Sequence, residues 1–124
     1  MRNPTILLVS QDLAVGRALA FALELEGYTV ESHAGSEALL GRMELPEAGC
    51  LVVDHAQPGL DGIDLVHHAR GQGRRLPAVL LATLPDRALR LRAAAAGVPV
   101  LEKPLLGEVL VEGIERALYG YDAA

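Results

Sequence analysis

Polar side chains with chemical potential follow several short apolar runs of this sequence, at the points where those runs end. They belong to four segments: Ser10-Gln11-Asp12, Asp54, Ala82-Thr83 and Lys103. In open α/β sheets, sites form outside the carboxyl ends of the strands. If the apolar runs are neighbouring parallel strands, these acid, amine and hydroxyl groups meet in one polar site.

The runs themselves are predicted to be strands. Asp54 follows Leu51-Val52-Val53, three large apolar residues of which two are β-branched, and this is typical of a strand buried on both faces of a parallel sheet. Further strands are predicted over residues 6–9, 28–33, 78–82 and 98–102. The alternation within 28–33 indicates a strand with one wetter face, at the edge of the sheet.

Helical patterns separate these strands. They comprise a helix with the apolar stripe Val15, Ala18, Leu19, Ala22 and Leu23, a short helix over 36–43, a helix capped by Asp61, a helix opened by Pro85 that stops at Gly97, and a helix over 106–118. Strict alternation of strands and helices predicts a doubly wound α/β fold, with five parallel strands and five helices. The length of 124 residues suits a single domain over 1–124.

Composition excludes some functions. The formal net charge of -5 and the scarcity of aromatic residues argue against direct binding of nucleic acid. Cys50 is the only cysteine, so no intramolecular disulfide is possible; it is expected to be a core residue rather than a reactive thiol. The first apolar run is too short for a signal peptide or membrane span, which favours the cytoplasm.

Three motifs together resemble the receiver domain of two-component response regulators, which has a flavodoxin-like fold. They are Asp54 at the end of its strand, Pro58-Gly59-Leu60-Asp61-Gly62, and Glu102-Lys103-Pro104. The resemblance covers nearly the whole chain. It implies a signalling module rather than an enzyme, with a sensor histidine kinase or another signalling protein as its partner.

The resemblance also implies roles for individual residues. Asp54 matches the aspartate that a histidine kinase phosphorylates, Lys103 matches the lysine that contacts the acyl phosphate, and Pro104 matches the cis-proline that aims this lysine. From the residues alone, Asp54 could instead cap the following turn, and Lys103 could be a solvated surface lysine.

The sequence departs from the family at the metal site. Typical members carry two adjacent acids that help bind Mg²⁺, and these positions align with Ser10 and Gln11. Because Mg²⁺ prefers carboxylates, we expect weak binding at best, through the Asp54 carboxylate and the backbone carbonyl of Gln57. Asp12 could compensate if the backbone re-aimed it, but it is expected to be a helix N-cap.

The phosphate-responsive positions also differ. The hydroxyl residue of the fourth strand aligns with Ala82, and Thr83 could replace it only where the strand has already turned. The aromatic residue of the fifth strand aligns with Val100. Each lost contact costs about 10²-fold in phosphoryl transfer. The sequence therefore predicts an atypical receiver with weak or no Mg²⁺-dependent phosphorylation at Asp54, which acts through protein contacts.

Two alternatives remain open. One is a fully competent receiver of a larger transcriptional regulator or hybrid kinase, in which Asp12 and Thr83 replace the missing groups. The other is a small-ligand or enzyme domain of flavodoxin-like fold, which would need a Gly-rich phosphate loop after the first strand that residues 10–13 do not supply.

Charged residues gather on the last two predicted helices: Arg87, Arg90, Arg92, Glu108, Glu112, Glu115 and Arg116. They predict either a solvated face or a homodimer surface. A zinc site is not expected, because His67 and His68 point about 100° apart on a helix and the other histidines lack a ligand set. Solvated histidines are the simpler interpretation.

Overall fold

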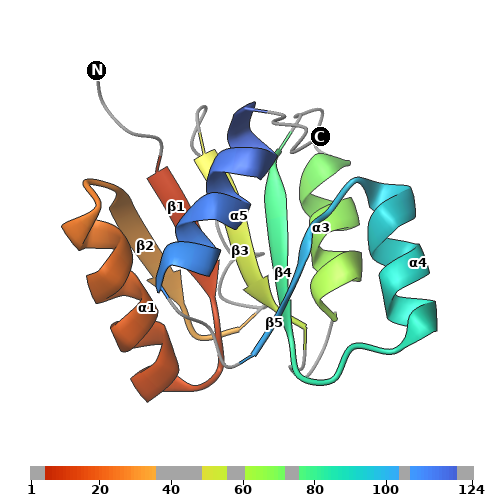
Figure 1. Cartoon of the computed structure of the whole chain (residues 1–124), viewed down its shortest axis with the longest axis horizontal. Helices are drawn as coiled ribbons and strands as arrows, with labels where there is room; N and C mark the ends of the chain where they lie inside the picture. The colour runs from red at the N-terminus through yellow and green to blue at the C-terminus, as the bar shows by residue number, and fades with distance from the viewer. Residues whose placement is uncertain (1–4, 36–48, 56–60, 72–75, 104–106, 120–124) are drawn as a thin grey trace.

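The computed structural model describes residues 5–35, 49–55, 61–71, 76–103 and 107–119. Five strands lie in this part of the chain: β1 (Thr5–Val9), β2 (Thr29–His33), β3 (Gly49–Asp54), β4 (Ala78–Ala82) and β5 (Val100–Glu102). The helices are α1 (Leu13–Leu25), α3 (Gly62–Arg70), α4 (Arg87–Ala96) and α5 (Gly107–Tyr119) (Figure 1). The helix expected over 36–43 falls outside the described residues. None of the described helices has the length and apolar character needed to cross a membrane.

The five strands form one parallel sheet in the order β2-β1-β3-β4-β5. The predicted five-stranded parallel sheet is therefore confirmed, with β2 at one edge. β3 is the central strand, and every residue from Gly49 to Asp54 is buried. Its register sets Val53 opposite Val9 and Asp54 opposite Leu81, so Asp54 reaches the carboxyl edge of the sheet between β1 and β4.

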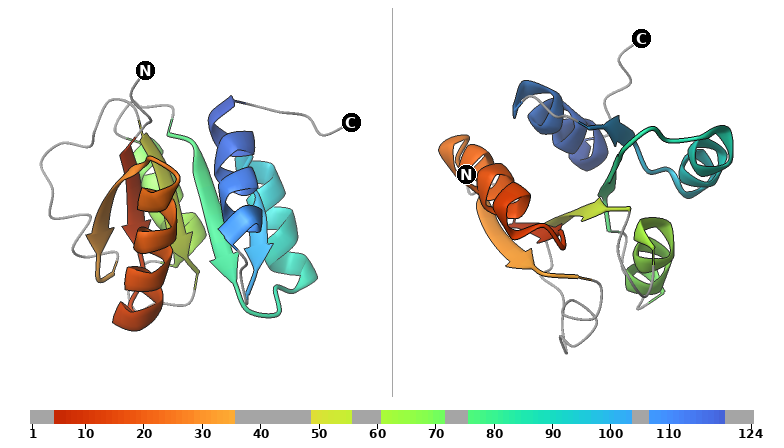
Figure 2. Two further views of the ribbon diagram at one scale, coloured as in Figure 1. Left: turned by 60° about the vertical axis from the view of Figure 1, so that its left-hand side comes forward. Right: turned by 90° about the horizontal axis from the view of Figure 1, so that it is seen from below.

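Helices cover both faces of the sheet: α1 and α5 lie on one face, and α3 and α4 on the other (Figure 2). Successive residues of a strand point to opposite faces, so each buried strand supplies two cores. Leu7 and Val53 pack on the α3–α4 side, while Ile6 and Val52 pack on the α1–α5 side. Cys50 is fully buried in the second core, as predicted, and burial raises the pKa of its thiol to about 12.

The predicted apolar stripe of α1 was partly wrong. Val15 and Ala18 are exposed, whereas Gly16 and Leu23 are buried and Leu19 is partly buried. The helix sequence LAVGRALAFALEL is apolar on almost every side, so several stripes have helical spacing. Periodicity alone could not identify the face that packs on the sheet.

Side-chain caps fix where the helices near the site begin. Asp86 accepts a hydrogen bond from the backbone N–H of Leu89 at 2.8 Å, so α4 begins at Arg87 and not at Pro85 as predicted. The same helix ends at Gly97, whose φ of 68° lies in the left-handed region. This end matches the predicted stop.

Candidate functional site

Asp54 and Lys103 meet at the carboxyl edge of the sheet. The Nζ of Lys103 donates to Oδ2 of Asp54 at 2.5 Å, and the carboxylate is 8% exposed. The backbone N–H of Lys103 donates to the carbonyl of Ala82 at 2.9 Å, so the lysine continues the pairing of β5 with β4. The sequence predicted this encounter from strand ends alone. Pro104 lies outside the described residues.

The segment after β1 does not add a second carboxylate to the Asp54–Lys103 pair. Ser10 is buried at the end of β1, and Gln11 is exposed. The Oδ1 atom of Asp12 accepts from the backbone N–H groups of Ala14 and Val15 at 3.1 and 3.2 Å. Asp12 is therefore the N-cap of α1, as predicted, and its carboxylate is occupied with the helix end.

The segment after β1 is a poor source of Mg²⁺ ligands. Carboxylate oxygens are the preferred ligands, whereas Ser10 and Gln11 carry none and the Asp12 carboxylate caps a helix. Within the described residues, no group of three or more His, Cys, Asp or Glu side chains could hold a metal ion. The Gln57 carbonyl lies outside the described part of the chain.

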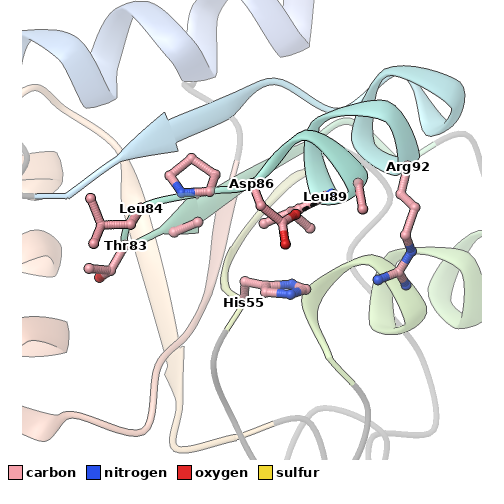
Figure 3. A pocket seen from close by; sticks show the side chains of 9 residues that line it. His55, Thr83, Leu84, Asp86, Leu89 and Arg92 are labelled. Atoms are coloured by element: carbon pink, nitrogen blue, oxygen red, sulfur yellow. Dashed lines mark hydrogen bonds between the residues drawn. The ribbon is translucent and has the colours of Figure 1, made fainter.

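A cavity of about 320 Å³ lies between His55, which directly follows β3, and α4 (Figure 3). Ala82 and Thr83 line it together with His55. β4 ends at Ala82, and Thr83 lies in the exposed bend beyond it. Val100 is partly buried in β5 and packs against the α3–α4 core.

His33 and His55 correct the expectation of solvated histidines, and the His33 ring is 12% exposed and lies 2.7 Å from the Glu31 carboxylate. His67 and His68 are exposed, but Nδ1 of His55 is buried and finds no hydrogen-bond partner within the described structure. The only feature of the sequence that pointed to this location of His55 was its position directly after Asp54. A buried polar atom without a hydrogen-bond partner lowers the stability of the fold, and such atoms are rare.

Two arginines tie α3 to α4. Arg92 of α4 forms ion pairs with Asp61 at 3.2 Å and with Asp64 at 3.3 Å, at the start of α3. Arg70 of α3 donates to the carbonyl of Ala96 at the end of α4. Arg92 is exposed, which agrees with the predicted solvated face, but its guanidinium also pairs with the start of α3, which was not predicted. A single sequence contains no signal for such a pair between two helices.

Burial tends to raise the pKa of Asp61, but hydrogen bonds from the Asp64 N–H and from Arg92, together with the charges of Arg92 and His55, lower it overall. A lowered pKa means that the fold favours the charged carboxylate. Its contribution to stability is therefore present above the ordinary pKa of about 3.9 and is lost as the pH falls through the lowered value.

The fold and the site agree with the protein family that the sequence matches. Residues 6–115 match the family described as the response regulator receiver domain. The chain belongs to this family. Transcriptional regulatory protein FixJ of Rhizobium meliloti (strain 1021) is 30% identical over 118 residues, which are 94% of this chain and 58% of that protein. Response regulator MprA of Mycobacterium tuberculosis (strain ATCC 25177 / H37Ra) is 37% identical over 116 residues, 91% of this chain and 50% of MprA.

A solved structure agrees with these matches. The crystal structure of FixJ-N superposes with a TM-score of 0.86 at 29% identity, and each chain is covered completely. The receiver family and its flavodoxin-like fold, expected from the motifs around Asp54 and Lys103, are thus confirmed. The chain is a receiver domain of the two-component response regulators, and it spans about half the length of the two curated relatives named above.

Proposed function

We propose that this chain is an atypical receiver in which Asp54 accepts a phosphoryl group slowly and with little dependence on Mg²⁺. The observation that carries this proposal is the orientation of Asp12, the acid nearest to the expected metal positions. Its carboxylate caps α1, while the two positions before it are Ser10 and Gln11. The two positions that carry metal-binding acids in typical receivers thus carry an uncharged hydroxyl and an uncharged amide here.

The reaction itself requires little from the protein beyond position and charge. An oxygen of Asp54 attacks phosphorus, the bond from phosphorus to the leaving group of the donor breaks, and the leaving group departs with the electron pair. Lys103, 2.5 Å from Asp54, would neutralise part of the charge of the incoming phosphoryl group. Ala82 has no hydroxyl to donate to that group. Removal of oriented contacts of this kind costs about 10²-fold each.

Acetyl phosphate provides the test, because it replaces the kinase. We expect incubation of the chain with acetyl phosphate and Mg²⁺ to yield a small fraction of singly phosphorylated protein by intact-mass measurement, with little change when Mg²⁺ is chelated. Asp54→Asn serves as the control for the modified residue. Rapid and nearly complete modification that requires both Mg²⁺ and Asp54 would instead support the competent receiver, with Asp12 and Thr83 as substitutes.

We further propose that residues 1–124 form one non-enzymatic module of a cytoplasmic regulator, with a sensor histidine kinase or another signalling protein as its partner. The length of the relatives supports a larger protein, since FixJ and MprA are each about twice as long as the matched region. FixJ is called a transcriptional regulatory protein. The net charge of -5 supports a receiver that leaves contact with nucleic acid to another part of such a regulator.

Self-association is proposed to use α4, β5 and α5. Leu91 on α4 and Val109 on α5 are exposed apolar residues, and Arg90 and Glu112 add charges of both signs. We expect sedimentation equilibrium to detect a weak dimer that salt weakens, and Arg90→Glu to shift it toward the monomer. Arg17→Glu, the same change on α1, is the control. An equal effect of the two variants would place the interface elsewhere.

A further inference from the structure

The cavity between His55 and α4 has the size and the lining of a small-ligand site. Its volume of about 320 Å³ lies at the lower end of the range for ligand pockets, about 300–1,000 Å³. Apolar side chains of the β4–α4 connection and of α4 form most of its wall: Ala82, Leu84, Pro85, Ala88 and Leu89. Four polar side chains complete it: His55, Thr83, Asp86 and Arg92. Such a mixture of apolar walls and few polar groups is typical of ligand pockets.

The polar groups converge on one side of this cavity. The carboxylate of Asp86 points toward the ring of His55, and the guanidinium of Arg92 lies beyond that ring (Figure 3). The ring carries the buried Nδ1 atom that lacks a partner within the described residues. That atom is closed to solvent, so the group that a ligand could reach on this side of the cavity is the Asp86 carboxylate.

The cavity wall also includes a strained residue. Leu84 has a φ of 47°, in the left-handed region that residues with side chains rarely adopt, and its side chain is 82% exposed. Unfavourable backbone of this kind persists where surrounding structure enforces it, and it is frequent at ligand clamps. The bend that Leu84 forms directs the chain from β4 around the cavity to the N-cap of α4.

The charges around the cavity favour a positively charged ligand. Asp61 and Asp64 pair with Arg92, so these two carboxylates more than offset its charge. Asp86 adds a third carboxylate, and it accepts only one hydrogen bond from the start of α4 among the described contacts. These four charged side chains, three carboxylates and one guanidinium, sum to a negative charge. An anionic ligand would therefore meet repulsion, whereas a cation would meet Asp86.

We propose that this cavity binds a small organic cation, an apolar body that carries an ammonium group. The apolar body packs on Leu89 and its neighbours, and the ammonium donates to the Asp86 carboxylate, beside the His55 ring. Binding would join the end of β3 to the start of α4, and so couple the Asp54 edge to the surface of α4. This site needs neither Mg²⁺ nor a phosphoryl donor, so its test is independent of the proposed slow phosphorylation.

Three matched probes test the charge and the place of binding: benzylamine, benzyl alcohol and benzoate. Each is titrated into the ¹⁵N-labelled chain without Mg²⁺, and amide shifts are followed. We expect saturable shifts from benzylamine at the amides of His55 and residues 82–92, at least about fivefold weaker binding of benzyl alcohol, and none of benzoate. Equal binding of all three, shifts centred elsewhere, or no saturation would overturn the proposal.

Variants separate a built site from general charge attraction. Asp86→Asn removes the charge but keeps a good N-cap, so the fold should survive. We expect it to weaken benzylamine binding about tenfold, whereas Asp12→Asn, the same change at the N-cap of α1, should have no effect. Ala88→Leu fills the cavity and should abolish binding, whereas Ala95→Leu, at an exposed position of the same helix that does not line the cavity, should preserve it. Equal effects within either pair would contradict the proposed site.

Discussion

Gly62→Ala is expected to destabilise the chain by roughly 1–3 kcal/mol, although alanine is the better helix former. Gly62 is the first residue of α3, and a Cβ atom there would clash with Cδ1 of Leu80 and lie 3.1 Å from Cα of His55. The end of the Leu80 side chain can move aside. The contact with His55, in contrast, is with backbone that directly follows Asp54. The helix must therefore shift outward, which loosens the strand end that holds Asp54.

Gly16→Ala provides a matched control in α1. A Cβ atom at Gly16 would meet only the Cβ of Ser10, at an ordinary 3.9 Å. Helix propensity then decides whether the variant is more or less stable, and its free energy of unfolding should rise by about 0.5–1 kcal/mol. Urea unfolding of the parent and both variants measures the two effects. A Gly62→Ala variant as stable as the parent would mean that α3 does not pack on β3 as closely as described.

The arrangement of the sheet and the Asp54–Lys103 pair could be predicted because both follow from chain order. Buried strands appear as continuous apolar runs, and parallel strands bring their carboxyl ends to one edge. Lys103 comes directly after β5, and its backbone pairs with Ala82 of β4, so strand order alone sets it close to Asp54. Asp12 was predicted as a cap for a similarly local reason, the few residues between β1 and α1.

The features that could not be predicted depend on contacts between separate elements. The pairs of Arg92 with Asp61 and Asp64 join residues about thirty positions apart. The sequence of neither helix predicts which other helix lies next to it. The burial of the Nδ1 atom of His55 also depends on contacts in the folded chain that a strand-end position does not reveal. The cavity likewise arises from the bend at Leu84, whose left-handed backbone no glycine or asparagine signalled.

The double change Ser10→Asp with Gln11→Asp is expected to restore measurable Mg²⁺ binding and to accelerate phosphorylation by acetyl phosphate about 10²-fold or more. Ser10 follows Val9, which lies opposite Val53 in the β1–β3 register, so a carboxylate there would stand next to Asp54. The same change should cost stability without the metal. A pair of unit charges 4 Å apart repels by roughly 4 kcal/mol at an effective dielectric constant of 20, before relaxation and partial protonation reduce this.

The stability effect of Asp54→Asn should therefore change sign between the two backgrounds. In the parent, Asp54 is paired with Lys103, and its neutralisation leaves the ammonium without its carboxylate, so the melting temperature should fall. In the double variant without metal, the same change relieves repulsion, so the melting temperature should rise. Added Mg²⁺ should stabilise the double variant by mass action, about 2.7 kcal/mol at a hundredfold excess over the dissociation constant, and leave the parent nearly unchanged.

Thermal melts of the four proteins across a Mg²⁺ series, at constant ionic strength, measure both effects. The comparison does not depend on phosphorylation, so it separates metal binding from catalysis. If a metal response of the parent came from the Asp12 carboxylate, Asp12→Asn would abolish the response while preserving the cap of α1. A parent that responds to Mg²⁺ as strongly as the double variant would show that it already holds the ion, and the proposed cause of slow phosphorylation would be wrong.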